Sequence, residues 1–241
     1  MTASPSVYLV TGAANGIGKA ISSLLLQKGH QVALLDKDTK ALENTLKNWP
    51  QSFQKNLSCW SVDLCNQQAM NQIIEQIESQ IAPIKCLAHA AGILRLSPLL
   101  DMQCDDFHSV MTLHVNASFN LLQKVGQAMA SRNHGAMVIV GSNAASTPRK
   151  NMGAYCASKA ALHMLTKCFA LELSEFGVRC NIVSPGSTRT LMQTQMWQQN
   201  YQEEQTIGGD LSQFRLGIPL QKIAEPMDIA QAVYFLLSDQ S

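Results

Sequence analysis

Three side chains in the middle of the chain have the types and spacing of a proton-transfer centre. Tyr155 and Lys159 are four residues apart, and Ser142 precedes them. Four residues is about one helical turn, so the lysine ammonium can approach the phenol. A free tyrosine has a pKa near 10, and neighbouring positive charge favours its phenolate. We therefore expect Tyr155 to act as a general base on a substrate hydroxyl that Ser142 holds.

A glycine-rich turn near the N-terminus carries a second kind of chemistry. It follows the apolar run Val7–Thr11 and opens a segment with helical periodicity. Glycines at such a turn let the backbone approach a pyrophosphate, and the helix N-terminus favours that anion. This pattern predicts a dinucleotide site. The expected contacts are Gly12, Asn15, Gly16, Ile17 and Gly18.

An acidic residue follows this turn at the end of the next apolar run. Asp36 is about twenty residues downstream, where a carboxylate can accept hydrogen bonds from both ribose hydroxyls. It would repel a 2′-phosphate and thus favours NAD over NADP. Lys19 and Lys37 are contrary signals, but direct contact outweighs solvated charges nearby. Asp63 and Leu64 follow the third run, where an adenine would lie.

The elements that must position these residues alternate along the chain. Short runs rich in aliphatic and β-branched residues are separated mostly by longer helix-periodic segments, which predicts a parallel sheet covered on both faces. We expect an α/β doubly wound parallel sheet (a Rossmann fold), as a single domain over residues 1–241, with ligands at the carboxyl ends of its strands. The predicted strands are Val7–Thr11, Gln31–Asp36, Leu57–Val62, Lys85–His89, Ala136–Gly141 and Val178–Val183.

A segment rich in glutamine and methionine interrupts this rhythm after the sixth predicted strand. Its position puts it over the ligand crevice, so we expect a substrate lid over about residues 187–217. Met192, Met196 and Trp197 are the candidate substrate contacts within it. A helical pair packed on the surface is the alternative interpretation.

Composition excludes several other classes of function. The chain has 241 residues and a formal charge of +1, without the concentrated positive charge that nucleic acids or anionic membranes require. Seven cysteines without a C-x-x-C pair predict reduced, buried thiols and a cytoplasmic protein. The N-terminal apolar run is too short for a signal peptide or membrane span. The near-neutral charge therefore favours a small-molecule partner. The six histidines lack the spacing of a metal site, so we expect no metal.

With these motifs in this order, the chain resembles the short-chain dehydrogenase/reductase family over essentially its full length. The resemblance implies that Ser142, Tyr155 and Lys159 are catalytic and that Asn116 completes a tetrad through a lysine-bound water. His89 stands where the family usually has asparagine. Further cofactor contacts implied by the resemblance are Ala90, Gly92, Pro185, Gly186 and Thr188.

The resemblance narrows, over segments such as Thr147–Arg149 and Leu216–Ala224, to members that oxidise a carboxylated ring diol. It implies NAD-dependent oxidation of 2,3-dihydro-2,3-dihydroxybenzoate to 2,3-dihydroxybenzoate in siderophore biosynthesis. A buried carboxylate needs a cation, for which Arg95 and Arg149 are candidates and Arg189 a weaker third. A surface role stays open for each of these arginines.

Two other functions remain open at this point. One is a carbonyl reductase or hydroxysteroid-type dehydrogenase with the same tetrad; the other is a catalytically silent dinucleotide sensor, which would need none of the tetrad. The expected helices around 113–129 and 157–173 are apolar on more than one face, which indicates a homo-oligomer, by resemblance a tetramer. We also expect the natural chain to extend beyond Ser241, because family members add an edge strand there.

Overall fold

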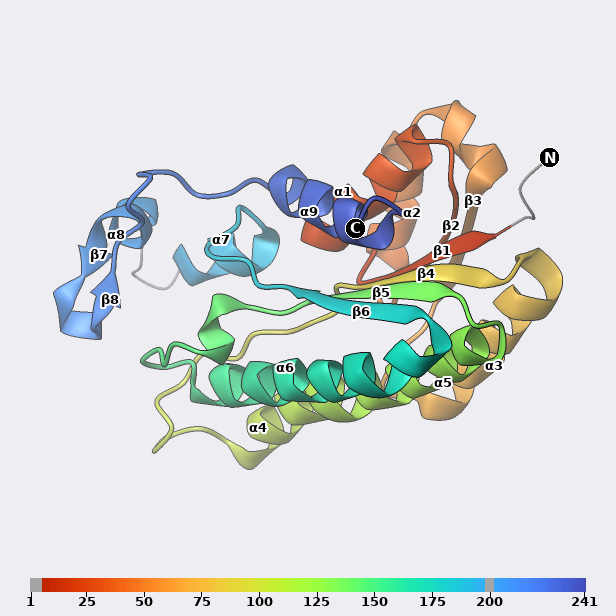
Figure 1. Ribbon diagram of the computed structural model, residues 1–241. Coiled ribbons are helices and arrows are strands. Elements are labelled where there is room, and N and C mark those ends of the chain that lie inside the picture. The colour runs from red at the N-terminus through yellow and green to blue at the C-terminus, as the bar shows by residue number, and fades with distance from the viewer. Residues whose placement is uncertain (1–5, 198–201) are drawn as a thin grey trace.

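A six-stranded sheet forms the centre of the computed structural model, which describes residues 6–197 and 202–241 (Figure 1). Its strands are β1 (Val7–Thr11), β2 (Gln31–Asp36), β3 (Leu57–Ser61), β4 (Ile84–His89), β5 (Gly135–Val140) and β6 (Val178–Val183). The main helices are α1 (Gly16–Gln27), α2 (Thr39–Asn48), α3 (Gln67–Gln76), α4 (Cys104–Met111), α5 (Ser118–Ser131), α6 (Gly153–Leu173) and α9 (Pro226–Leu237). Beyond β6 lie α7 (Leu191–Trp197), α8 (Glu203–Gly208) and the short antiparallel pair β7 (Gly209–Asp210) and β8 (Arg215–Leu216).

The strands are all parallel and lie in the order β3-β2-β1-β4-β5-β6. Chain order therefore reverses between β1 and β4. At such a switch point the loops after two neighbouring strands diverge and leave a crevice at the carboxyl ends. The predicted doubly wound parallel sheet is confirmed.

The sheet is covered on both faces because successive side chains of its inner strands, which point to opposite faces, are mostly apolar. On β1, Val7 and Leu9 belong to one buried cluster, while Tyr8 and Val10 belong to the other. Helices α3 to α6 lie on one face, and α1, α2 and α9 on the opposite face (Figure 1). Burial on both sides is why these strands read as continuous apolar runs.

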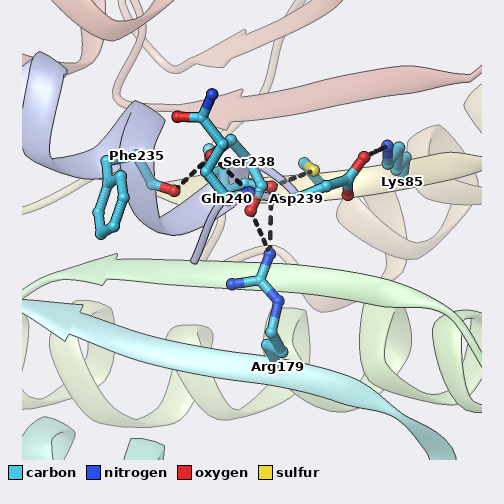
Figure 2. A network of polar contacts seen from close by, with 8 residues as sticks. Lys85, Arg179, Phe235, Ser238, Asp239 and Gln240 are labelled. Atoms are coloured by element: carbon cyan, nitrogen blue, oxygen red, sulfur yellow. Dashed lines mark hydrogen bonds and ion pairs between the residues drawn. The ribbon is translucent and has the colours of Figure 1, made fainter.

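The end of α9 is tied to the sheet by a polar network (Figure 2). Arg179 on β6 donates to the carbonyl oxygens of Leu236 at 2.6 Å and Ser238 at 2.9 Å. Lys85 on β4 forms an ion pair with Asp239 at 3.2 Å. Helix C-termini leave carbonyls without intrahelical partners, so a guanidinium here stabilises the helix end.

The cysteines differ from expectation. All seven are free, but Cys59, Cys65, Cys104 and Cys168 are exposed, so the prediction of buried thiols is wrong for these four. Cys65 and Cys104 stand among polar residues, and Cys59 and Cys168 occupy exposed positions of β3 and α6. Within residues 6–197 and 202–241, no helix is long and apolar enough to cross a bilayer.

Candidate active site

A cavity of about 530 Å³ lies at the carboxyl ends of the strands, at the switch point. The glycine turn, the ends of β2 and β5, the loop after β4, the start of α6 and the segment after β6 all contribute to its lining. It thus brings together two motifs that are far apart in sequence. The sequence-predicted residues that line it are Gly12, Asn15, Gly16, Ile17, Gly18, Asp36, Ala90, Gly92, Arg149, Pro185, Gly186, Thr188, Met192 and Met196, together with Ser142, Tyr155 and Lys159.

The glycine turn is shaped by two close approaches. Gly12 has φ +65°, and a Cβ there would lie 2.8 Å from the Cα of Ala91 in the loop after β4. A Cβ on Gly18 would lie 2.1 Å from the carbonyl oxygen of Gly12. Neither site has room for a side chain, so the N-terminus of α1 is held against the end of β1 and opens onto the cavity.

Asp36 is held at the cavity edge by backbone donors. Its Oδ2 accepts from Ala14 N–H and its Oδ1 from Asp38 N–H, both at 3.0 Å. The carboxylate is therefore oriented without a ligand. Lys37, whose charge would favour NADP over NAD, also lines the cavity.

Two residues expected near the adenine lie outside this lining. Asp63 is exposed, and its Oδ1 accepts from Cys65 N–H at 2.9 Å. Leu64 is buried in the hydrophobic cluster beneath the sheet. The structure does not bring either side chain into the cavity, because one closes its own turn and the other packs in the core.

The proton-transfer residues meet where β5 ends and α6 begins. Ser142 lies just after β5, where its hydroxyl is near enough to the Tyr155 hydroxyl to lower the pKa of the phenol. Lys159 is 4% exposed; its Nζ donates to the Val140 carbonyl at 3.0 Å and lies 5.8 Å from the Tyr155 ring centroid. Helical spacing thus places the ammonium on the same face as the phenol, as predicted.

Burial dominates the electrostatics of this pair. It raises the pKa of Tyr155, and the Ser142 hydroxyl and the Arg149 charge lower that pKa only in part. Burial also lowers the pKa of Lys159 to about 8. Burial of the phenol thus opposes its ionisation, and positive charge beside it would favour the phenolate.

The Asn116 side chain does not line the cavity. It lies in η3 (Thr112–Ala117), a π-helical turn between α4 and α5, where it is exposed and outside the cavity lining. His114, two residues earlier, is 0% exposed and packs beside the Tyr155 ring, with the ring centroids 5.6 Å apart. Consecutive helical residues are rotated by about 100°, so a shift of two positions points to the opposite side. The Asn116 side chain therefore lies outside the cavity lining, and its water-mediated contact to Lys159 stays a prediction.

His114 links the loop after β4 to the first turns of α6. Its Nε2 accepts from Ile93 N–H at 3.0 Å, and its Nδ1 lies 2.8 Å from the Ser158 hydroxyl. Ser158 donates to the Tyr155 carbonyl at 2.8 Å, so the hydroxyl accepts from His114 Nδ1–H. These partners fix one neutral tautomer, and burial lowers the His114 pKa to about 2.

His89 forms a second buried link beneath the cavity. Its Nδ1 lies 2.7 Å from the Thr11 hydroxyl and its Nε2 2.7 Å from the Ser118 hydroxyl. Burial lowers the His89 pKa to about 3. The uncharged imidazole therefore joins the ends of β1 and β4 to α5. The sequence had shown only that a histidine replaces the family's usual asparagine here.

The candidate substrate residues separate into two groups. Arg149 lines the cavity and donates to Asn143 Oδ1 at 3.1 Å. Arg95 is exposed, outside the lining, and forms an ion pair with Asp106 at 3.1 Å. Trp197 also lies outside the lining, with its Nε1 donating to Thr206 at 3.2 Å. The structure therefore brings Arg149 into the site and leaves Arg95 and Trp197 out.

Arg189, the weaker third candidate, holds the segment beyond β6 to the body of the protein. It is exposed and forms ion pairs with Glu203 of α8 at 2.6 Å and Glu225 at the start of α9 at 2.9 Å. It does not line the cavity. Two residues that sequence reasoning missed, Gln193 on α7 and Arg215 on β8, do line it.

Comparison with known proteins places this site in context. The chain matches the short chain dehydrogenase family over residues 6–201. It is 47% identical to a Vibrio cholerae vibriobactin-specific 2,3-dihydro-2,3-dihydroxybenzoate dehydrogenase, over 98% of this chain and 90% of that protein. It is 39% identical to a Bacillus subtilis 2,3-dihydro-2,3-dihydroxybenzoate dehydrogenase, with the same coverage of 98% and 90%. The crystal structure of an NAD+-bound xylitol dehydrogenase superposes with a TM-score of 0.86 at 28% identity, covering 100% of this chain and 95% of that one.

Proposed function

The chain belongs to the short-chain dehydrogenase family, and we propose that it oxidises 2,3-dihydro-2,3-dihydroxybenzoate to 2,3-dihydroxybenzoate with NAD+, as a step in siderophore biosynthesis. The observation that carries the proposal is the single cavity that joins the glycine turn and Asp36 to Tyr155, Ser142 and Lys159. Relatives at 47% and 39% identity bear the name of this activity. Family membership supports a nicotinamide dinucleotide as cofactor.

The residues present fit such a cofactor. The N-terminus of α1 offers backbone donors for a pyrophosphate, and the backbone-held Asp36 offers acceptors for ribose hydroxyls. A carboxylate fixed in this way disfavours a 2′-phosphate, which supports NAD over NADP. Thr188, buried at the opposite side of the lining, is the proposed contact for the nicotinamide carboxamide.

The reaction removes the proton from the hydroxyl oxygen of one carbinol group and a hydride from its carbon. A bound oxidised nicotinamide would supply the hydride acceptor and positive charge near the phenol. Tyr155 takes the hydroxyl proton, and Ser142 holds the substrate oxygen through its own hydroxyl. Lys159 supplies positive charge to the phenolate from the same helix face. The ketone left behind tautomerises to the aromatic diol, which makes this direction strongly favourable.

The test is direct. Purified protein is mixed with NAD+ and 2,3-dihydro-2,3-dihydroxybenzoate, and NADH absorbance is followed together with catechol fluorescence. We expect equal molar increases in NADH and 2,3-dihydroxybenzoate. No turnover, at protein concentrations up to those of the substrate, would reject the proposal and leave another reductase or hydroxy-dehydrogenase activity as the assignment to pursue.

We also propose that the protein forms a homo-oligomer, by family resemblance a tetramer. Apolar side chains project from the outer surfaces of α5 and α6, where Phe119 is 39%, Met164 61% and Leu171 78% exposed. Such a surface is more stable when covered. Sedimentation velocity measures the assembly, and a monomer at micromolar concentration would contradict this proposal.

A further inference from the structure

The far end of the cavity differs in charge from the end at Asp36. Of the described residues that line it, the only carboxylates are Asp36 and Asp38, both near the end of β2. The part formed by the loop after β5 and the segment beyond β6 instead carries Arg149 and Arg215. Arginine guanidiniums in a partly apolar cavity favour an anionic ligand with planar acceptor geometry.

A second, independent observation points to a ligand here. The Nε2 of Gln193 is buried, and the described part of the chain provides it with no hydrogen-bond partner. Gln193 lies on α7, beside Met192 and close to Met196, and all three line the cavity. A buried amide donor without an acceptor is costly, so an acceptor on a bound molecule would relieve it.

We propose that Arg215 and Gln193 complete, with Arg149, the subsite that binds the substrate carboxylate and so determines specificity for acidic ring diols. This inference rests on the proposed function and deepens it. Arg149 comes from the loop after β5, where Asn143 holds it, whereas Arg215 comes from β8 and Gln193 from α7. This places the carboxylate in the cavity between the body of the protein and the segment beyond β6, whose course is seen in Figure 1.

The methionines explain why this subsite suits a ring acid. Met152, Met192 and Met196 line the same cavity and give the hydrocarbon ring an apolar, adaptable surface. The ring can then lie against these thioethers while its carboxylate meets the guanidiniums. A neutral diol would make the same ring contacts but would offer no carboxylate to the guanidiniums or to the Gln193 amide.

The experiment compares two substrates in the wild type and four variants. The kcat/KM values for 2,3-dihydro-2,3-dihydroxybenzoate and for the uncarboxylated 3,5-cyclohexadiene-1,2-diol are measured in the wild type, Arg215→Gln, Gln193→Leu and the matched control Arg95→Ala. We expect the first two variants to lose about 10- to 100-fold on the acid and less than threefold on the neutral diol. Arg95→Ala should match the wild type on both, because Arg95 lies outside the cavity. Arg215→Lys should recover part of the loss.

Binding measurements keep the two proposals separate. Calorimetry in the presence of NADH compares 2,3-dihydroxybenzoate with catechol, and the preference for the acid should shrink at least tenfold in Arg215→Gln. Equal losses on acid and neutral ligands, or weakened NAD+ binding in place of weakened acid binding, would overturn the subsite. If the wild type oxidises neither diol, the proposed function fails, and this binding preference alone decides the subsite.

Discussion

Mild acid is expected to destabilise the folded protein through its two buried histidines. Burial lowers the pKa of His89 to about 3 and of His114 to about 2, whereas a histidine in an unfolded chain has a pKa near 6.5. Below about pH 6.5 the unfolded chain therefore binds two protons that the folded chain does not. The free energy of unfolding should fall as the pH drops through the window from about 6.5 to about 3.

The size of this effect follows from the linkage relation. Between about pH 7 and pH 5, each histidine costs about 2 kcal/mol, or about 4 kcal/mol for the pair. This is a large part of the roughly 5 to 15 kcal/mol that stabilises a typical domain. The loss should be resolved by urea unfolding, followed by circular dichroism, at a series of pH values across this range.

Two variants decide whether the buried imidazoles are responsible. His114→Gln removes one titrating group, so its loss over the same pH range should be about 2 kcal/mol smaller than in the wild type. His134→Gln, at an exposed position, is the matched control and should keep the wild-type loss. An equal pH dependence in His114→Gln and wild type would refute the reasoning, whatever the variant's stability at neutral pH.

Three further expectations concern the cavity. Gly12→Ala should lower Tm and weaken NAD+ binding at least tenfold, because the new Cβ would meet the Ala91 backbone at 2.8 Å; Gly29→Ala, with open space around it, is the control, and equal cofactor affinity in both would contradict the close approach. Asp36→Asn should reduce the ratio of kcat/KM for NAD+ over NADP+ at least tenfold, and an unchanged ratio would disprove its role at the ribose. Lys159→Met should lower kcat by about 10²- to 10⁴-fold; a wild-type pH–rate profile and rate in this variant would exclude the ammonium from proton transfer.

The fold was predictable because its strands carry a local signal. Val32 to Leu35 and Met137 to Val140 are buried on both sides of the sheet, so each reads as an uninterrupted apolar run. The six predicted strands agree with the structure to within one residue at either end. The glycine turn and the pair Tyr155 and Lys159 were equally predictable, because each is a pattern of residues close together in the sequence.

The remaining site residues could not be predicted from local spacing, because their positions depend on how distant segments of the chain pack together. The family resemblance indicated Asn116, but in the π-helical turn its side chain is exposed, whereas His114 packs beside Tyr155. Arg95 and Arg149 both follow strand ends, yet only the second turns inward, because Asn143 holds it while Asp106 holds the first outside. Gln193 and Arg215 reach the cavity only through the course of the segment beyond β6.

The kinetics of Tyr155→Phe test the central claim most directly. The substitution removes the hydroxyl and keeps the ring that packs beside His114, at a centroid distance of 5.6 Å. We expect kcat for 2,3-dihydro-2,3-dihydroxybenzoate to fall by about 10²- to 10⁴-fold while the Kd for NADH stays within threefold of the wild type. A variant that turns over at the wild-type rate would contradict the assignment of Tyr155 as the base and, with it, the mechanism proposed for this cavity.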